Sequence, residues 1–178
     1  MKIPYRFKVI FLSFLAVFIC YIDRVNISVA IIPMQDQFGW SEIQKGFILS
    51  SFYIGYMITM IVGGYIADKY GGKKVLGYCL IIWSIFTIIT PFFAYLGIWW
   101  LLFIRVLMGL GEGITFPSWH AIYARWIPFK ERTRAVAFTN SGIAAGTMFG
   151  YGMAAIIISN YSWEWVFYLF GMLGFFWI

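Results

Sequence analysis

Six apolar runs, separated by short charged or glycine-containing joints, account for most of the chain. They cover residues 9–33, 43–67, 75–95, 98–123, 135–159 and 165–178. A helix that crosses a bilayer needs about 20 predominantly apolar residues, and each of the first five runs can supply them. The pattern predicts an all-α integral membrane protein, a bundle of six helices with the sixth incomplete.

The sixth run differs from the others in length. As a helix its ~14 residues would extend roughly 21 Å, which is short of the ~30 Å hydrocarbon core. A carboxylate ending there would lie in the membrane, where an unpaired charge is costly. We therefore expect a truncated gene product or a fragment of a longer protein.

The first run imitates a signal peptide, because Lys2, Arg6 and Lys8 precede it and Ala30 lies near a small-residue cleavage pattern. Charged residues interrupt that pattern, and the run continues to Pro33. We expect it to be retained as the first spanning helix.

The composition agrees with a membrane protein. Hydrophobic residues make up 62% of the chain and charged residues 11%, whereas about 25% of a typical soluble domain is charged. The net charge of +6 does not indicate a nucleic-acid partner, because the basic residues are dispersed among the joints and form no single patch. The expected surroundings are a lipid bilayer.

The basic joints predict how the chain is oriented. Lys and Arg residues gather at the amino terminus and at the second and fourth joints, whereas the alternate joints hold only Lys45. Cytoplasmic loops carry the positive excess, so the amino terminus is expected in the cytoplasm, with the plasma membrane as the location. Five tryptophans are expected to form an interfacial belt at the outer joints: Trp40, Trp99, Trp100, Trp163 and Trp165.

Four ionisable residues lie inside predicted spans: Asp23 and Arg24 in the first, Arg105 and Glu112 in the fourth. A charge at mid-membrane costs about 2.5–3.5 kcal/mol even on a lenient scale, so each is a candidate functional residue. A buried guanidinium suits a carboxylate ligand, and a carboxyl group removed from water can carry a proton near neutral pH. The alternative is a structural salt-bridge network that joins the two helices.

The fourth run also carries signals for close packing and for a bend. Arg105 and Glu112 are seven residues apart and share a helix face without touching. Gly109 and Gly113 lie on that face and favour close helix packing. Pro117 removes a helical hydrogen bond, so we expect a bend near the candidate site. In helix 43–67, the Tyr56 hydroxyl can bind a polar ligand or simply pack.

The second joint, residues 64–74, reads G-Y-I-A-D-K-Y-G-G-K-K. Gly71 and Gly72 permit a tight turn, and Asp68 can accept bonds from a basic side chain or lie at a helix amino terminus. Such a contact of Asp68 could hold one conformation of the protein closed. Farther along, Gly142, Gly146 and Gly150 recur every four residues and predict one smooth packing face.

These motifs resemble the major facilitator superfamily. Its signature between helices 2 and 3, G-x-x-x-D-x-x-G-R-[KR], is similar to residues 64–74, although Gly72 stands at the usual Arg position. Three further stretches resemble the anion–cation symporter family within it: Y-I-D-R-V-N-I-S from Tyr21, R-V-L-M-G-L-G-E-G from Arg105 and W-I-P-F-K-E-R from Trp126. The chain resembles the amino-terminal half of such a transporter.

The resemblance implies two six-helix bundles with a central site and alternating access. The expected partners are a small organic anion such as a sugar acid, a proton and the missing carboxy-terminal half. When the family's site residues are carried over to the matching positions, Arg24 and Tyr56 would contact the anion. Arg105 would also bind the anion and would couple to Glu112. Asp23 and Glu112 would be the protonatable acids. The gating loop would comprise Gly64, Asp68, Gly71 and Lys73.

Two other classes of function stand beside this one. A non-transporting remnant or assembly partner would use its charged residues only to hold helices together. An enzyme is not expected, because no nucleophile–base pair or metal-ligand set is recognisable and no cofactor is implied. Cys20 and Cys79 lie inside apolar segments and are interpreted as core residues.

Overall fold

Helices form almost all of the chain in the computed structural model, which describes residues 4–177. Its elements are α1 (Tyr5–Phe38), α2 (Glu42–Tyr70), α3 (Gly72–Leu96), α4 (Ile98–Glu112), α5 (Thr115–Trp126), α6 (Phe129–Asn160) and α7 (Glu164–Phe175). Helices α4 and α5 together make one span, so the predicted six-helix bundle is confirmed. Lys2 and Ile178, which figured in the sequence predictions, lie outside the described residues.

Five of the spans are long and apolar enough to cross a membrane, and α7 is a shorter apolar helix. The helices extend beyond the apolar runs: α1 has 34 residues and α6 has 32. A helix satisfies its own backbone hydrogen bonds, so it can continue past the apolar segment into polar residues.

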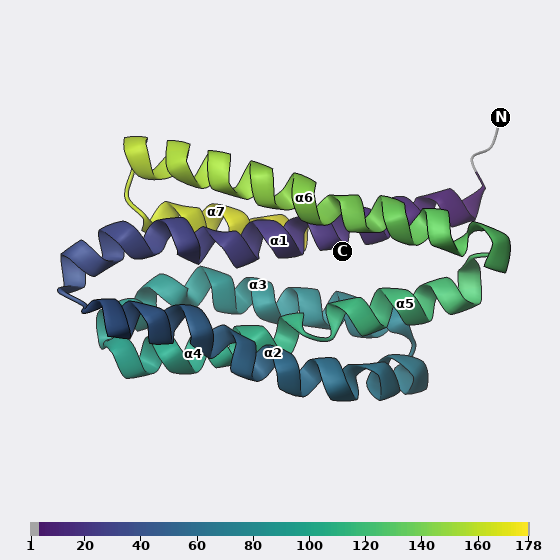
Figure 1. The fold of residues 1–178 in the computed structure, drawn as a ribbon, viewed down its shortest axis with the longest axis horizontal. Coiled ribbons are helices and arrows are strands. Elements are labelled where there is room, and N and C mark those ends of the chain that lie inside the picture. The colour runs from purple at the N-terminus through teal and green to yellow at the C-terminus, as the bar shows by residue number, and fades with distance from the viewer. Residues whose placement is uncertain (1–3, 178) are drawn as a thin grey trace.

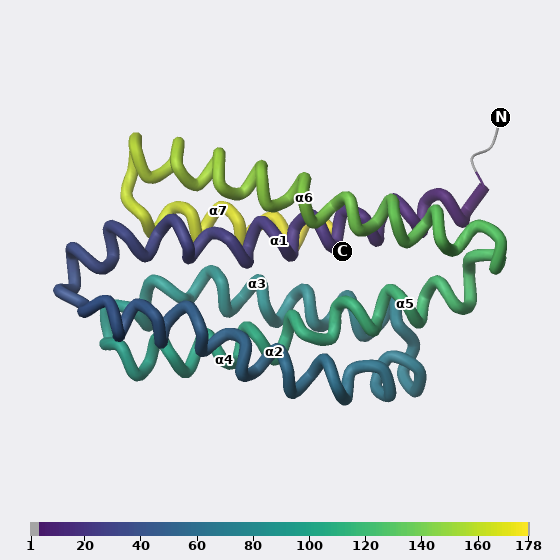
Figure 2. The backbone as a smooth tube through the Cα atoms, viewed as in Figure 1, coloured from purple at the N-terminus to yellow at the C-terminus, as the bar shows by residue number. Residues whose placement is uncertain are grey.

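The helices form two groups (Figures 1 and 2). In this view α1, α6 and α7 occupy one group, and α2 to α5 occupy the other. Helix α1 packs mainly on α6, and α2 packs mainly on α4. Helix α7 contacts both α1 and α3 and so connects the two groups.

Glycines allow the closest of these helix contacts. A Cβ atom added at Gly109 in α4 would overlap the backbone carbonyl oxygen of Phe52 in α2, and one at Gly55 would overlap that of Val106. In the other group, Gly142 and Gly146 of α6 lie against the backbone of α1. The packing faces predicted from the glycine spacing are therefore confirmed.

One residue of the expected tryptophan belt has a different role. Trp99, Trp100 and Trp165 are exposed, as a belt requires, but Trp163 is only 4% exposed. Its ring stacks on Tyr95, and its indole N–H donates to Gln37 Oε1 at 2.7 Å. Trp163 is therefore a packing residue that joins the outer ends of α1, α3 and α7.

Gly109→Ala is predicted to destabilise the fold. The added methyl group must push α2 away from α4, and overpacking of this kind costs about 1–3 kcal/mol, or about 2–10 °C in melting temperature for a chain of this size. Gly77→Ala in α3 is the matched control, because a Cβ there has no neighbour within 4 Å. Equal melting temperatures for the two purified variants would contradict the close contact.

Candidate functional site

A buried ion pair between α1 and α4 is the centre of the candidate site. The Arg24 guanidinium places Nη2 at 2.6 Å and Nε at 2.8 Å from Glu112 Oε1. The Glu112 side chain is 1% exposed and that of Arg24 is 15% exposed. The side chains of Arg24 and Glu112 are therefore in contact, and only that of Arg24 remains partly exposed.

Aromatic rings surround the Arg24 guanidinium. Its central carbon lies 4.6 Å from the Tyr21 ring centroid, 4.7 Å from that of Tyr56 and 5.4 Å from that of Phe52. Such cation–π contacts are each worth about 0.5–2 kcal/mol, depending on desolvation. They hold the positive charge in place whether or not the carboxylate remains its partner.

Asp23 is the second buried acid. It contacts α3, whereas Arg24 contacts α4. Its Oδ2 accepts a hydrogen bond from the Trp83 indole N–H of α3 at 3.1 Å, and the residue is fully buried. Oδ1 has no hydrogen-bond partner among residues 4–177. Asp23 therefore depends on a neutral donor, whereas Glu112 has a full counter-charge.

Arg105 forms no ion pair with Glu112 in this structure, so the expected coupling between them stays a prediction. Arg105 is 2% exposed, its guanidinium lies 5.1 Å from the Phe52 ring centroid, and Nη1 is 3.8 Å from Met108 Sδ. Seven residues of helix separate Arg105 and Glu112 by roughly 10.5 Å along the axis. Arg24 reaches Glu112 instead, because α1 places it level with the end of α4.

The helix is broken directly after Glu112, a few residues before Pro117 in the chain. Helix α4 ends at Glu112 and α5 begins at Thr115, with Gly113 and Ile114 between them. Proline cannot donate to the carbonyl four residues before it, which is that of Gly113, and its ring crowds the same group. The predicted bend is confirmed, and it leaves Glu112 as the last residue of α4.

Three contacts of the site were not recognised from the sequence. Phe52 lies beside both guanidinium groups, Trp83 holds Asp23, and Cys20 Sγ lies 2.8 Å from Glu112 Oε1. One signal was available: Cys20 is four residues before Arg24 and so shares its helix face. Phe52 and Trp83 carry no such signal within their own helices.

Of the predicted gating loop, Gly64 and Asp68 lie in α2 and Lys73 lies in α3. Gly71 alone lies between the two helices. Gly71 has φ +90°, so a positive-φ glycine makes the tight turn. Arg125 of α5 donates to the backbone carbonyl of Asp68 at 3.0 Å. Asp68 and Lys73 are exposed, and a Cβ at Gly64 would meet nothing within 4 Å.

Close packing explains the departure from the signature at Gly72. This residue is buried, and a Cβ there would overlap the Ser118 carbonyl oxygen of α5. A side chain as large as arginine does not fit without moving α5. The loop is therefore anchored to α5 by a backbone contact and by Arg125.

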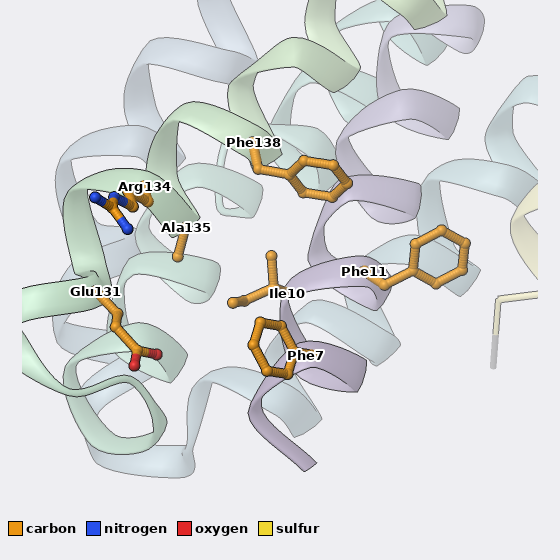
Figure 3. Close-up of a pocket in the computed structure, with 7 residues that line it drawn as sticks. All are labelled: Phe7, Ile10, Phe11, Glu131, Arg134, Ala135 and Phe138. Atoms are coloured by element: carbon orange, nitrogen blue, oxygen red, sulfur yellow. The ribbon is translucent and has the colours of Figure 1, made fainter. Parts of the chain in front are cut away.

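An apolar pocket beside the first turns of α1 includes none of the predicted site residues. About 420 Å³ in volume, it lies between these turns and the start of α6 (Figure 3). Its lining residues are Phe7, Ile10, Phe11, Glu131, Arg134, Ala135 and Phe138. Arg6 pairs with Glu131 beside it at 3.3 Å. We do not assign this pocket to the site.

Comparison with known proteins identifies similar sequences. A profile of the Major Facilitator Superfamily matches residues 13–178. The chain is 46% identical over 176 residues to "Probable anion transporter 1, chloroplastic" of Oryza sativa subsp. japonica, covering 99% of this chain and 33% of that protein. It is 44% identical over 177 residues to "Sodium-dependent phosphate transport protein 1, chloroplastic" of Arabidopsis thaliana, covering 99% and 35%. The chain thus spans about a third of the length of these relatives.

A solved structure has the same fold. It is a bacterial homologue of the human lysosomal transporter Spinster, in an inward-facing and occupied conformation. The TM-score is 0.85 at 22% sequence identity, and the match covers 99% of this chain and 44% of that one. At this identity the likeness concerns the fold alone.

The Asp23–Trp83 contact is predicted to stabilise the bundle. Trp83→Phe removes the indole donor to a buried carboxyl group, which should cost about 1–3 kcal/mol of unfolding free energy. Because the substitution also removes volume, it should be repeated in an Asp23→Leu background, where no carboxyl group needs a donor. Unfolding in detergent should show a smaller cost there; equal costs in both backgrounds would contradict the contact's role.

Proposed function

The chain belongs to the Major Facilitator Superfamily, whose profile matches residues 13–178, and from that premise we propose that it forms part of a proton-coupled symporter. The proposed substrate is a small organic anion, a sugar acid or another carboxylate, carried by alternating access. The observation that supports this most is the buried Arg24–Glu112 ion pair, with Arg24 partly open on one face.

Arg24 is the proposed anion ligand. An arginine fork binds a carboxylate through two parallel N–H donors. In this structure Nε donates to Glu112 Oε1, and Nη2 lies within ion-pair distance of the same oxygen. Glu112 thus occupies the position that a substrate carboxylate would take. The half-buried Tyr56, whose ring lies beside the guanidinium, is the proposed second contact to the anion.

Protonation of Glu112 is the proposed coupling step. A neutral carboxyl group attracts a guanidinium much less than a carboxylate does, so protonation releases Arg24 for the substrate. The guanidinium that is released is that of Arg24, because Arg105 has no ion pair with Glu112 in this structure. Arg105 instead supplies a second, fixed positive charge beside Phe52. Asp23 is the other proposed protonatable acid.

The charges of the site explain why anion and proton should move together. With both acids ionised, Asp23 and Glu112 balance Arg24 and Arg105. Protonating Glu112 leaves one net positive charge, and a bound monovalent anion removes it. The site is then neutral in only two states: without anion and with Glu112 ionised, or with both the anion and the proton bound. A net buried charge is costly in the membrane. We propose that the transporter changes conformation in these two states.

The relatives support the anion and leave the coupling ion to experiment. One is named a probable anion transporter and another a sodium-dependent phosphate transport protein. The proposed proton rests on Glu112 and Asp23, two acids that are buried within the spans.

The remaining parts of the proposal concern topology and assembly. On the basis of the basic joints, we place the amino terminus in the cytoplasm. The plasma membrane is the proposed location, whereas both relatives are named as chloroplastic proteins. A second, carboxy-terminal bundle would complete the central site. The loop with Gly64, Asp68, Gly71 and Lys73 would gate it from the cytoplasmic side.

Glu112→Gln is predicted to abolish proton-driven accumulation. In proteoliposomes of the full-length protein, one proton per monovalent anion gives about tenfold accumulation of labelled gluconate for each unit of pH gradient. The glutamine amide cannot exchange a proton, so the empty site keeps one net positive charge and cannot return across the membrane. Net uptake should therefore stop, while exchange of internal for external gluconate continues. Undiminished accumulation would contradict the role of Glu112. Glu131→Gln, which removes a surface ion-pair partner, is the matched control and should accumulate gluconate normally.

Arg24→Gln separates this proposal from a purely structural role for the charges. A transporter should lose most gluconate binding while the purified protein still folds. In a non-transporting remnant or assembly partner, gluconate would not bind even the unmodified protein, whereas a lower melting temperature for Arg24→Gln is expected in both cases.

A further inference from the structure

Cys20 is an uncharged side chain that contacts the ion pair through a hydrogen bond to the acid. Its Sγ lies 2.8 Å from Glu112 Oε1, and the residue is fully buried in α1, one turn before Arg24. It also packs within a cluster of buried apolar residues: Ala16, Leu76, Leu80 and Trp83. The interpretation of Cys20 as a core residue is therefore incomplete.

The chemistry of the two groups determines which of them donates. A thiol is ordinarily protonated at neutral pH, and an ionised carboxylate can only accept. The S–H bond therefore points to Oε1. Arg24 Nε donates to the same oxygen, so two hydrogen bonds converge on Oε1, and Arg24 Nη2 adds an ion-pair contact.

We propose that Cys20 is a positioning residue for the proton site: its thiol donates a hydrogen bond to Glu112 Oε1 and stabilises the carboxylate that pairs with Arg24. Donors to a carboxylate favour its charged form over its neutral form. When Glu112 is protonated, Oε1 becomes a weaker acceptor, and the thiol bond weakens together with the ion pair. This inference rests on the proposed function for its role in transport.

Other charged and titratable groups act on Glu112 from the surrounding helices. They are Tyr21, Asp23 and Arg24 of α1, Tyr56 of α2 and Arg105 of α4. Cys20 differs from the charged members of this group because it can be replaced without changing the net charge of the site. Its contribution can therefore be measured apart from the electrostatic balance.

The first test observes the thiol directly by infrared spectroscopy. In the full-length protein, the S–H stretching band of Cys20 is identified by its loss in Cys20→Ala. At high pH the band should lie at the lowered frequency of a strong hydrogen bond, and it should move toward the free-thiol frequency as Glu112 is protonated. In Glu112→Gln the band should not respond to pH. A free-thiol band at every pH in the unmodified site would overturn the proposal.

The second test follows the carboxyl stretching band of Glu112, identified by its loss in Glu112→Gln. Cys20→Ala should raise the midpoint of its pH titration by about one unit, since a hydrogen bond to a charged group is worth about that much. Cys20→Ser keeps a donor and should remain near the original midpoint, as should Cys79→Ala. An unchanged midpoint in Cys20→Ala would overturn the proposal, whatever its effect on melting temperature.

The two proposals can fail separately. If the midpoint moves as expected but gluconate accumulation in Glu112→Gln is normal, the role of Cys20 at Glu112 holds and the proposed coupling is wrong. If accumulation is lost in Glu112→Gln but the Cys20→Ala midpoint is unchanged, the coupling holds and the role of Cys20 is wrong.

Discussion

The ion pair between Arg24 and Glu112 is the interaction that organises the site. Isolated, either charge would be costly inside an apolar bundle, and removing one partner of a buried pair typically costs about 3–5 kcal/mol. The pair is stable here because two hydrogen bonds and the ion-pair contact meet one oxygen and aromatic rings flank the guanidinium. The same arrangement makes the ion pair sensitive to protonation, because one proton on Glu112 removes the negative charge that balances Arg24.

Close helix packing makes that ion pair possible. Glycines at 55 and 109 let α2 and α4 approach until backbone meets backbone, and the break after Glu112 ends α4 at the residue that Arg24 reaches. Phe52 then lies beside the two groups that must remain charged, Arg24 and Arg105. Side chains from α1, α2 and α4 thus meet at one point, although α1 packs mainly on α6.

Much of this could be predicted from the sequence, because the relevant signals are local. Apolar length indicated the spans, glycine spacing indicated the packing faces, and a charge within a span identified Asp23, Arg24, Arg105 and Glu112. What could not be predicted was the pairing between helices. The resemblance implied a coupling of Arg105 to Glu112, but the rotation and depth of α1 bring Arg24 to Glu112 instead. Cys20 was missed for a related reason: within its own helix a thiol is indistinguishable from a small core residue.

Proton uptake on anion binding tests the exchange of Glu112 for the substrate at Arg24 most directly. Gluconate would be added to the purified full-length protein in weakly buffered detergent solution, at a pH where Glu112 is ionised. We predict that about one proton leaves the solution for each anion bound, since Arg24 can exchange Glu112 for the substrate only when Glu112 is neutralised. Glu112→Gln should bind gluconate with no proton uptake. Binding without a pH change in the unmodified protein would contradict the exchange.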